Sequence, residues 1–213
     1  SEMVGEFSDL QGIMGGIFAS KRGENEVVSQ AIYEQYLPSG QDSPVPSTLA
    51  GAMLSMADKA DTLVGCFGLK KIPTGANDPY ALRRGVLGIC RIILEKKLRL
   101  DISEFLAETL AVYGDIQWKL DKGDILAKLN EFIAGRLKSY FVAKGFSTLA
   151  VEAAIGAGID DVWALSARLE ALDVFSKEDD FEQAVLTFKR AGNIIRKQGG
   201  KDLTGEYQAE LFE

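Results

Sequence analysis

Apolar residues return at every third or fourth position along most of the chain, and this spacing restricts the fold more than any other feature of the sequence. The clearest run lies between Pro46 and Gly68, where apolar side chains fall on one stripe of a helix. They are Leu49, Met53, Met56, Ala60, Leu63, Val64 and Phe67. The opposite face carries short side chains, including Gly51 and Ser55, which would let another backbone approach closely. No segment has a convincing strand pattern, so the sequence predicts an all-α fold.

Similar stripes predict helices in most of the remaining chain. One helix is expected to begin at Asp78 and Pro79, which suit a helix N-cap and a first turn, and to bury Leu82, Val86, Ile89, Cys90 and Ile93. Another is expected from Asp101 to Gly114. Four more are expected near residues 125–141, 147–158, 160–176 and 179–199, the last with a stripe of Phe181, Val185, Phe188, Gly192 and Ile195. Between these groups the periodicity lapses in "GDIQWKLDKGD" (114–124), which predicts a domain boundary between residues 114 and 115.

Composition narrows the class of protein. With 213 residues, 46% of them apolar, the chain can bury a full core. No apolar run approaches the roughly 20 residues of a membrane span. The first ten residues also lack the basic and hydrophobic regions of a secretory leader. We therefore expect a cytoplasmic protein that does not contact a membrane.

The residues that usually carry catalysis are scarce. The chain has no histidine, which removes the commonest general base and the commonest transition-metal ligand. Cys66 and Cys90 lie within apolar helical patterns, so buried thiols are expected. The sequence also lacks P-loop, GxGxxG, zinc-spaced cysteine and Ser-His patterns. It therefore predicts no catalytic residue and no metal site in this chain.

Charge is distributed unevenly. The chain has a net charge of -7, yet residues 66–99 carry eight basic and two acidic side chains, a local charge of +6. A second basic run contains Lys189, Arg190, Arg196, Lys197 and Lys201, with no acid between residues 189 and 201. Such segments are typical either of an electrostatic surface for nucleic acid or of ordinary solvated helix faces.

The first basic segment includes "LKKIPTGANDPYALRRG" (69–85), a turn that opens into a helix. Lys70, Lys71, Arg83 and Arg84 flank it, and a helix N-terminus with unpaired N–H groups attracts anions. One interpretation is a phosphate-binding corner. The other is a basic turn whose arginines brace acidic side chains inside the fold.

Asp58 and Asp61 are the acidic side chains that such a turn could brace. Three residues apart on the helix predicted before the turn, they project to neighbouring parts of one face. They could pair with Arg83, Arg84 or Lys59, hold a hard cation, or simply be exposed. We expect structural charge pairing.

Four segments resemble the bacterial glycyl-tRNA synthetase beta subunit, and they occur in that family's order. They are "FSDLQGIMGGIFA" (7–19), "ADKADTLVGCFGL" (57–69), "PTGANDPYALRRGVLGICRIILEKKLRLDI" (73–102) and "FKRAGNII" (188–195). Subunits of this family are much longer, so the resemblance implies an internal fragment.

The resemblance implies a role in an α2β2 ligase. The alpha subunit of such enzymes activates glycine with ATP and magnesium, and the beta subunit supplies the large tRNA-binding portion. The expected partners are tRNA-Gly, the alpha subunit and the remainder of the beta subunit, with no cofactor in this fragment. Residues 1–114 resemble an HD-like helical domain, and residues 115–213 resemble a DALR-type anticodon-binding domain that is cut short near "YQAELFE".

The resemblance implies that certain residues in or beside the matching segments contact RNA or support such contacts. The RNA-binding candidates are Lys70, Lys71, Arg83, Arg84, Lys189, Arg190, Asn193, Arg196 and Lys197. Asp58 and Asp61 are carried over as supports. Gly16 departs from the family pattern, because a basic residue is expected there.

Two other functions stay open. A structural or subunit-docking module would place an apolar patch beside Arg84 and Arg91. A degenerate HD-type phosphohydrolase would bind metal near Asp58 and Asp61, although true HD hydrolases also need histidine ligands that this chain lacks.

Overall fold

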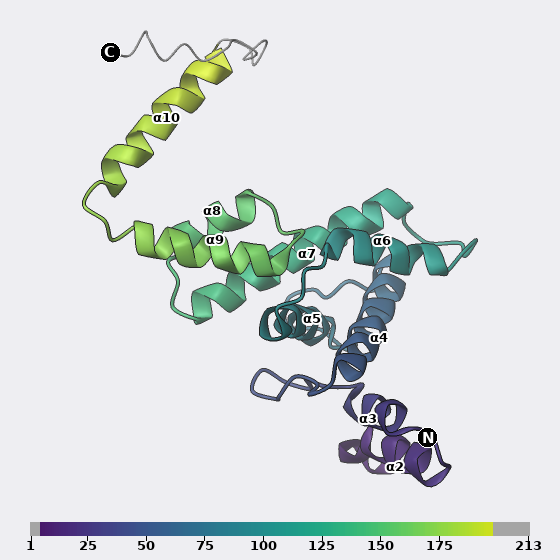
Figure 1. Ribbon diagram of the computed structural model, residues 1–213. Helices are drawn as coiled ribbons and strands as arrows, with labels where there is room; N and C mark the ends of the chain where they lie inside the picture. Colours follow the sequence, from purple (N-terminus) through teal and green to yellow (C-terminus); the bar gives the residue numbers. More distant parts are fainter. Residues whose placement is uncertain (1–4, 198–213) are drawn as a thin grey trace. The chain divides into compact units, whose positions relative to one another are not determined.

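The computed structural model describes residues 5–197 of the chain (Figure 1). Lys201 and "YQAELFE", both used in the sequence analysis, lie outside the described residues. Within them the fold is all-α, as the spacing predicts. Its elements are η1 (Ser8–Leu10), α2 (Ile13–Lys21), α3 (Glu26–Glu34), α4 (Leu49–Gly68), α5 (Leu82–Lys96), α6 (Ile102–Val112), α7 (Lys122–Ala143), α8 (Thr148–Gly156), α9 (Val162–Phe175) and α10 (Phe181–Lys197).

Backbone contacts divide the chain into two compact units, one up to Glu170 and one from Ala171 onward. The lapse in periodicity after Gly114 is a loop, but α7 beyond it packs against α4, α5 and α6 inside the first unit. A division of function between residues 1–114 and 115–213 therefore stays a prediction about the family's domains.

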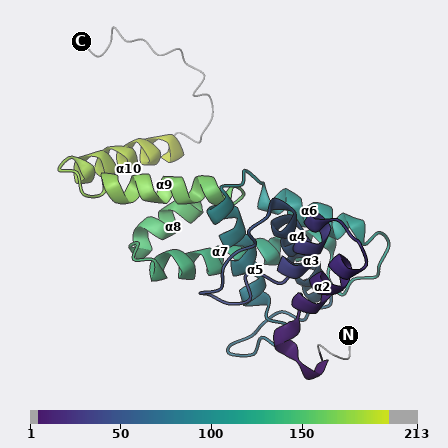
Figure 2. The ribbon, with the colours of Figure 1, turned by 60° about the horizontal axis from the view of Figure 1, so that its bottom comes forward.

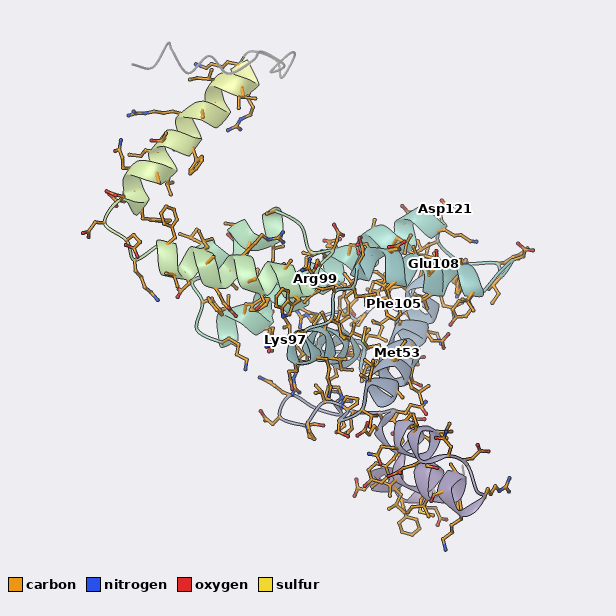
Figure 3. All side chains as sticks on the ribbon, in the orientation of Figure 1. Met53, Lys97, Arg99, Phe105, Glu108 and Asp121 are labelled. Atoms are coloured by element: carbon orange, nitrogen blue, oxygen red, sulfur yellow. The ribbon has the colours of Figure 1, made fainter. Side chains whose placement is uncertain are left out.

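Helix α4 is the centre of the first unit and packs against α3, α5, α6 and α7; its neighbours α3 and α6 are visible beside it in Figure 2. Five of the seven stripe residues are buried: Met56, Ala60, Leu63, Val64 and Phe67. The stripe fails at its start, because Leu49 and Met53 are 59% and 63% exposed. Met53 is labelled on α4 in Figure 3. There the short-residue face turns inward instead, and Gly51 and Ser55 are buried.

A buried carboxylate fixes the approach of α3 to the start of α4. Glu34, only 3% exposed, accepts hydrogen bonds from the backbone N–H groups of Ser47 and Thr48 at 2.9 and 3.1 Å. The hydroxyl groups of both residues and the amide of Gln30 donate to it as well. Burial by itself raises the pKa of Glu34, but these bonds outweigh it and lower the pKa from 4.5 to about 2.

Helix α5 begins three residues later than the sequence predicts. Pro79 lies in a turn before the helix, and the N-cap is Ala81 in a left-handed conformation (φ 55°). Asp78 still caps the helix, because its carboxylate accepts from the N–H groups of Leu82 at 2.8 Å and Arg83 at 3.0 Å. The predicted stripe of α5 is confirmed: Leu82, Val86, Ile89, Cys90 and Ile93 are each at most 1% exposed.

The two thiols are free within the described residues, and they differ in burial. Cys90 is fully buried, which raises the pKa of its thiol to about 12. Cys66 is half-buried, and burial raises the pKa of its thiol as well.

The second unit contains the end of α9 and the whole of α10. The rings of Phe175 and Phe181 meet edge to face with centroids 5.3 Å apart. None of the α10 side chains is buried in the described structure, so the stripe expected on this helix lies open. Val185, Phe188 and Ile195 are 45%, 74% and 40% exposed.

No helix among residues 5–197 is long and apolar enough to cross a membrane.

The Glu34 cluster predicts a specific pH dependence of stability. Because folding lowers the pKa of Glu34, its ionised form stabilises the protein above pH 4.5, and this stabilisation is lost as the pH falls toward 2. A shift of this size corresponds to about 3 kcal/mol. Urea denaturation from pH 7 to pH 2 should show Glu34→Gln destabilised at pH 7 by a few kcal/mol, with a flatter profile below pH 5. The matched control is Glu24→Gln, at an exposed position; equal profiles for the two variants would contradict the assignment.

Candidate nucleic-acid interface

The basic corner of the sequence is a loop that joins α4 to α5. Thr74 and Asn77 exchange backbone hydrogen bonds of 3.2 and 2.9 Å, which close a tight turn around Gly75 (φ 52°). Arg83 in the first turn of α5 donates to the carbonyl oxygen of Gly75 at 2.6 Å. This bond ties the loop to the helix and holds the guanidinium group beside it.

The other cations of the corner are exposed. Lys71 donates to the Tyr80 hydroxyl at 2.9 Å, and its Nζ lies 4.9 Å from the centroid of that ring. The hydrogen bond to Tyr80 raises the pKa of Lys71, so the lysine stays charged. Within residues 5–197 the side chains of Lys70 and Arg84 have no hydrogen-bond or ion-pair partner, and both face solvent.

The backbone N–H groups at the start of α5 are already occupied, which bears on the interpretation of this corner as a phosphate-binding site. The Asp78 carboxylate already accepts the N–H groups of Leu82 and Arg83. It also places a negative charge at the helix terminus, where an anion would bind. Any phosphate bound at this corner would therefore be held by side chains.

Neutral groups donate hydrogen bonds to the carboxylates of both Asp58 and Asp61, and of the expected charge pairing the described residues show only the effect of the Asp58 charge on Lys59. Asp58 accepts from the Gln35 amide at 3.0 Å, and Asp61 accepts from the Tyr113 hydroxyl at 2.7 Å. None of the ion pairs among the described residues includes either aspartate. These bonds tie α4 to the residues that end α3 and α6, so the arginines of α5 are left for other contacts.

Two side chains beside these aspartates have perturbed pKa values. Burial lowers the pKa of Lys59 to about 8, against the opposing charge of Asp58. Lys59 donates to the Leu37 carbonyl oxygen at 3.1 Å and to the Ser55 hydroxyl at 2.7 Å. Burial, together with the bond to Asp61, raises the pKa of Tyr113 to about 12.

Some of the basic residues in the first segment brace the fold. Arg91 donates from one nitrogen to three carbonyl oxygens, those of Gly40, Gln41 and Ser43, at 2.8 to 3.2 Å. Its other nitrogens bind Glu95 at 2.8 and 3.0 Å. Lys96 donates to the Ser47 carbonyl oxygen. A count of charged residues in the sequence does not distinguish these cations from the exposed ones, because the carbonyl groups that accept their hydrogen bonds come from distant parts of the chain.

A braced cation lies just after α5. Arg99 pairs with Asp161 at 2.7 Å, and its guanidinium carbon lies 5.4 Å from the Trp163 ring centroid (Figure 3). This pair links the end of α5 to the start of α9 within the first unit. It is therefore committed to the fold and does not belong to the candidate interface.

The second group of candidates lies on α10, in the other unit. All of its members are exposed: Lys189, Arg190, Asn193, Arg196 and Lys197. Asn193 accepts from Arg196 at 3.0 Å, so this amide orients a neighbouring cation. This group and the corner of the first unit belong to different units of the chain.

The sequence analysis missed one basic residue, Arg136, which lines a pocket beside the basic residues of α5. Arg136 of α7 lines a pocket of about 380 Å³ together with Arg83, Arg84 and Arg91 of α5. It lies between the buried residues Ile133 and Leu137, and the sequence analysis used this segment only for its apolar stripe. The signal in the sequence that could have identified Arg136 is its position next to a buried apolar stripe.

A second pocket, of about 440 Å³, adjoins the first through Arg84 and contains Asp58, Lys59 and Tyr80. A degenerate phosphohydrolase would place its metal here. Across the described part of the chain, no group of three or more His, Cys, Asp or Glu side chains could hold a metal ion.

Comparison with known proteins places the chain among aminoacyl-tRNA synthetase subunits. A model of the family described as "Glycyl-tRNA synthetase beta subunit" matches residues 1–156. The glycine–tRNA ligase beta subunits of Solidesulfovibrio magneticus and Oleidesulfovibrio alaskensis are 59% and 62% identical to it, over 100% of this chain and 31% of each relative. The beta subunit of Lawsonia intracellularis is 48% identical over the same shares. The chain belongs to the glycyl-tRNA synthetase beta subunit family, as its motifs predict, and it spans about a third of the length of these relatives.

The division of the arginines into bracing and exposed groups predicts different effects on stability. Arg91→Gln should lower the free energy of unfolding by about 2–3 kcal/mol, because it leaves three carbonyl groups and Glu95 without their donor. Arg84→Gln should change it by less than about 0.5 kcal/mol. Urea denaturation followed by circular dichroism measures both values. Equal losses in the two variants would show that the assignment of Arg91 is wrong.

Proposed function

We propose that the chain is a tRNA-binding portion of the glycine–tRNA ligase beta subunit, supporting ATP-dependent glycylation of tRNA-Gly that is catalysed with the alpha subunit. The observation that carries the proposal is the gathering of exposed cations around the α4–α5 loop of an acidic chain. Lys70, Lys71 and Arg84 face solvent there, with Arg83 beside them. Membership of the beta subunit family supports RNA as the partner.

The physical basis is exchange of counterions. Lysine and arginine side chains that neutralise RNA phosphates release condensed cations from the nucleic acid, so binding weakens as salt rises. Cations committed to internal carbonyl groups, such as Arg91, cannot contribute. The net charge of -7 repels RNA elsewhere on the surface and favours an orientation that presents the basic residues.

The partners and cofactors follow from the same proposal. The chain acts in the cytoplasm with the alpha subunit and with the remainder of the beta subunit. ATP and magnesium bind through the alpha subunit. This chain supplies no catalytic residue, and its HD-like and DALR-like portions position tRNA.

Subunit docking is a second candidate, favoured by the open apolar stripe of α10. Phe188 is 74% exposed, and Val185 and Ile195 are also exposed. Large exposed apolar groups of this kind often mark surfaces that contact protein. The two roles are compatible, because the stripe and the corner belong to different units of the chain.

Binding of the full 213-residue chain to tRNA-Gly transcript across a salt series tests the proposal. Lys70→Gln/Arg84→Gln removes two exposed charges without breaking a hydrogen bond of the described structure. We expect weaker binding at low salt and a log–log salt slope reduced by about 1.5–2, because each lost phosphate contact accounts for roughly 0.7–0.9.

The matched control is Lys122→Gln/Lys128→Gln, which removes two exposed charges from α7. It should leave the slope and the affinity nearly unchanged. Equal effects in the two double variants would indicate a response to net charge alone. Absence of binding by the wild-type chain would overturn the proposal and favour docking.

A further inference from the structure

A pocket lined by four arginines lies in the first unit, between α5, α7 and the loop after α3. Its volume is about 380 Å³, and Arg83, Arg84, Arg91 and Arg136 contribute to its walls. No acidic side chain lines it. Four positive groups around one small space repel each other unless the space holds compensating charge.

The four guanidinium groups differ in how many hydrogen bonds and ion pairs they make within the protein. Arg91 is saturated by Glu95 and three carbonyl groups. Arg83 uses one nitrogen for the Gly75 carbonyl oxygen. Arg84 and Arg136 make neither a hydrogen bond nor an ion pair with any described residue. The positive charge of the pocket is therefore only partly compensated by the protein.

Arg136 is the most informative of the four. Its Nε–H is buried and has no acceptor among residues 5–197. Leaving a buried donor unpaired costs roughly 1–3 kcal/mol, and more when the group is charged. Its neighbours on α7, Ile133 and Leu137, are buried apolar residues and offer no acceptor. An anion in the adjoining pocket would supply the acceptor that this guanidinium group lacks.

A neutral hydroxyl group at the pocket adds a hydrogen-bond donor. Ser139 and Tyr140 of α7 lie in its lining, but the Ser139 hydroxyl already donates to the Gly135 carbonyl oxygen at 3.0 Å, which leaves the Tyr140 hydroxyl to donate. Burial raises the pKa of Tyr140, so its hydroxyl group stays protonated and able to donate. Guanidinium groups and hydroxyl groups commonly bind phosphate by donating hydrogen bonds to its oxygens.

We propose that this arginine pocket binds a phosphate group. The pocket gives the tRNA proposal a defined site, and the part of our inference that names tRNA as the source of the phosphate rests on that proposed function. The other source of the same chemistry is free phosphate or a small phosphate compound. Arg84 and Arg136 bind the phosphate oxygens, while Arg91 keeps the wall in place.

The test compares Arg136→Gln with Lys128→Gln in the full chain. Both variants remove one positive charge from α7, but Lys128 is exposed and lies outside the pocket. Two quantities are measured for each protein: the rise in the thermal midpoint caused by inorganic phosphate at constant ionic strength, and the affinity for tRNA-Gly transcript. In phosphate-free buffer Arg136→Gln should be at least as stable as the wild type, because it removes a partly buried charge whose Nε–H has no acceptor.

We expect phosphate to stabilise the wild type and Lys128→Gln but not Arg136→Gln. Loss of about tenfold in tRNA affinity in Arg136→Gln would identify the RNA backbone as the source of the phosphate. Unchanged tRNA affinity with lost phosphate stabilisation would support the pocket as a site for a small phosphate compound. Stabilisation by phosphate in a wild-type chain that does not bind tRNA would support the pocket and overturn the proposed function.

The inference is overturned if phosphate fails to stabilise the wild type, or if Arg136→Gln and Lys128→Gln respond alike to phosphate. If Arg136→Gln fails to fold, Arg136→Lys serves as the test variant. It keeps the positive charge and loses the planar guanidinium group. Phosphate should then stabilise this variant several-fold more weakly than the wild type, measured as the concentration needed for half the effect. An unchanged response in Arg136→Lys would overturn the inference as well.

Discussion

Close approach to α4 from two sides is the constraint on which the rest of the first unit depends. One side of the helix is apolar and packs on α5, α6 and α7, and the other is short enough to admit α3. A side chain at Gly51 would begin 2.3 Å from the Glu34 carboxylate, and one at Gly68 would begin 2.1 Å from the Trp118 ring. These contacts leave room for hydrogen only. The buried carboxylate of Glu34 and the placement of the α3–α4 loop follow from this geometry.

The position of that loop then determines which arginines of α5 have hydrogen-bond partners inside the protein. Residues 40–43 fold back onto α5 and occupy Arg91, and Asp78 occupies the N–H groups at the helix start. Asp58 and Asp61 take neutral donors from Gln35 and Tyr113. Arg84 is consequently left without an internal partner, and it lines two neighbouring pockets of the first unit. Internal hydrogen bonding thus selects which cations are available to a ligand.

The two candidate binding surfaces of this chain would bind their partners through different interactions. The corner and the arginine pocket offer charge, which suits a phosphate-bearing partner and is sensitive to salt. The stripe of α10 offers apolar area, which suits a protein partner and is insensitive to salt. The proposed function, in which the chain binds RNA and joins a larger assembly, would use surfaces of both kinds. The relatives of this chain are about three times its length.

The sequence by itself determined the helical fold, the buried stripe of α5, the role of the Asp78 carboxylate at the start of that helix, and the family. These depend on spacing along one helix or on short motifs, which are local properties of the chain. The tertiary structure decided which face of α4 is buried near Met53, which donors serve Asp58 and Asp61, and that Arg136 joins Arg84 at one pocket. Such pairings join residues up to 52 positions apart, as in the bonds from Tyr113 to Asp61. They arise from how helices pack, and no periodicity within a single segment encodes them.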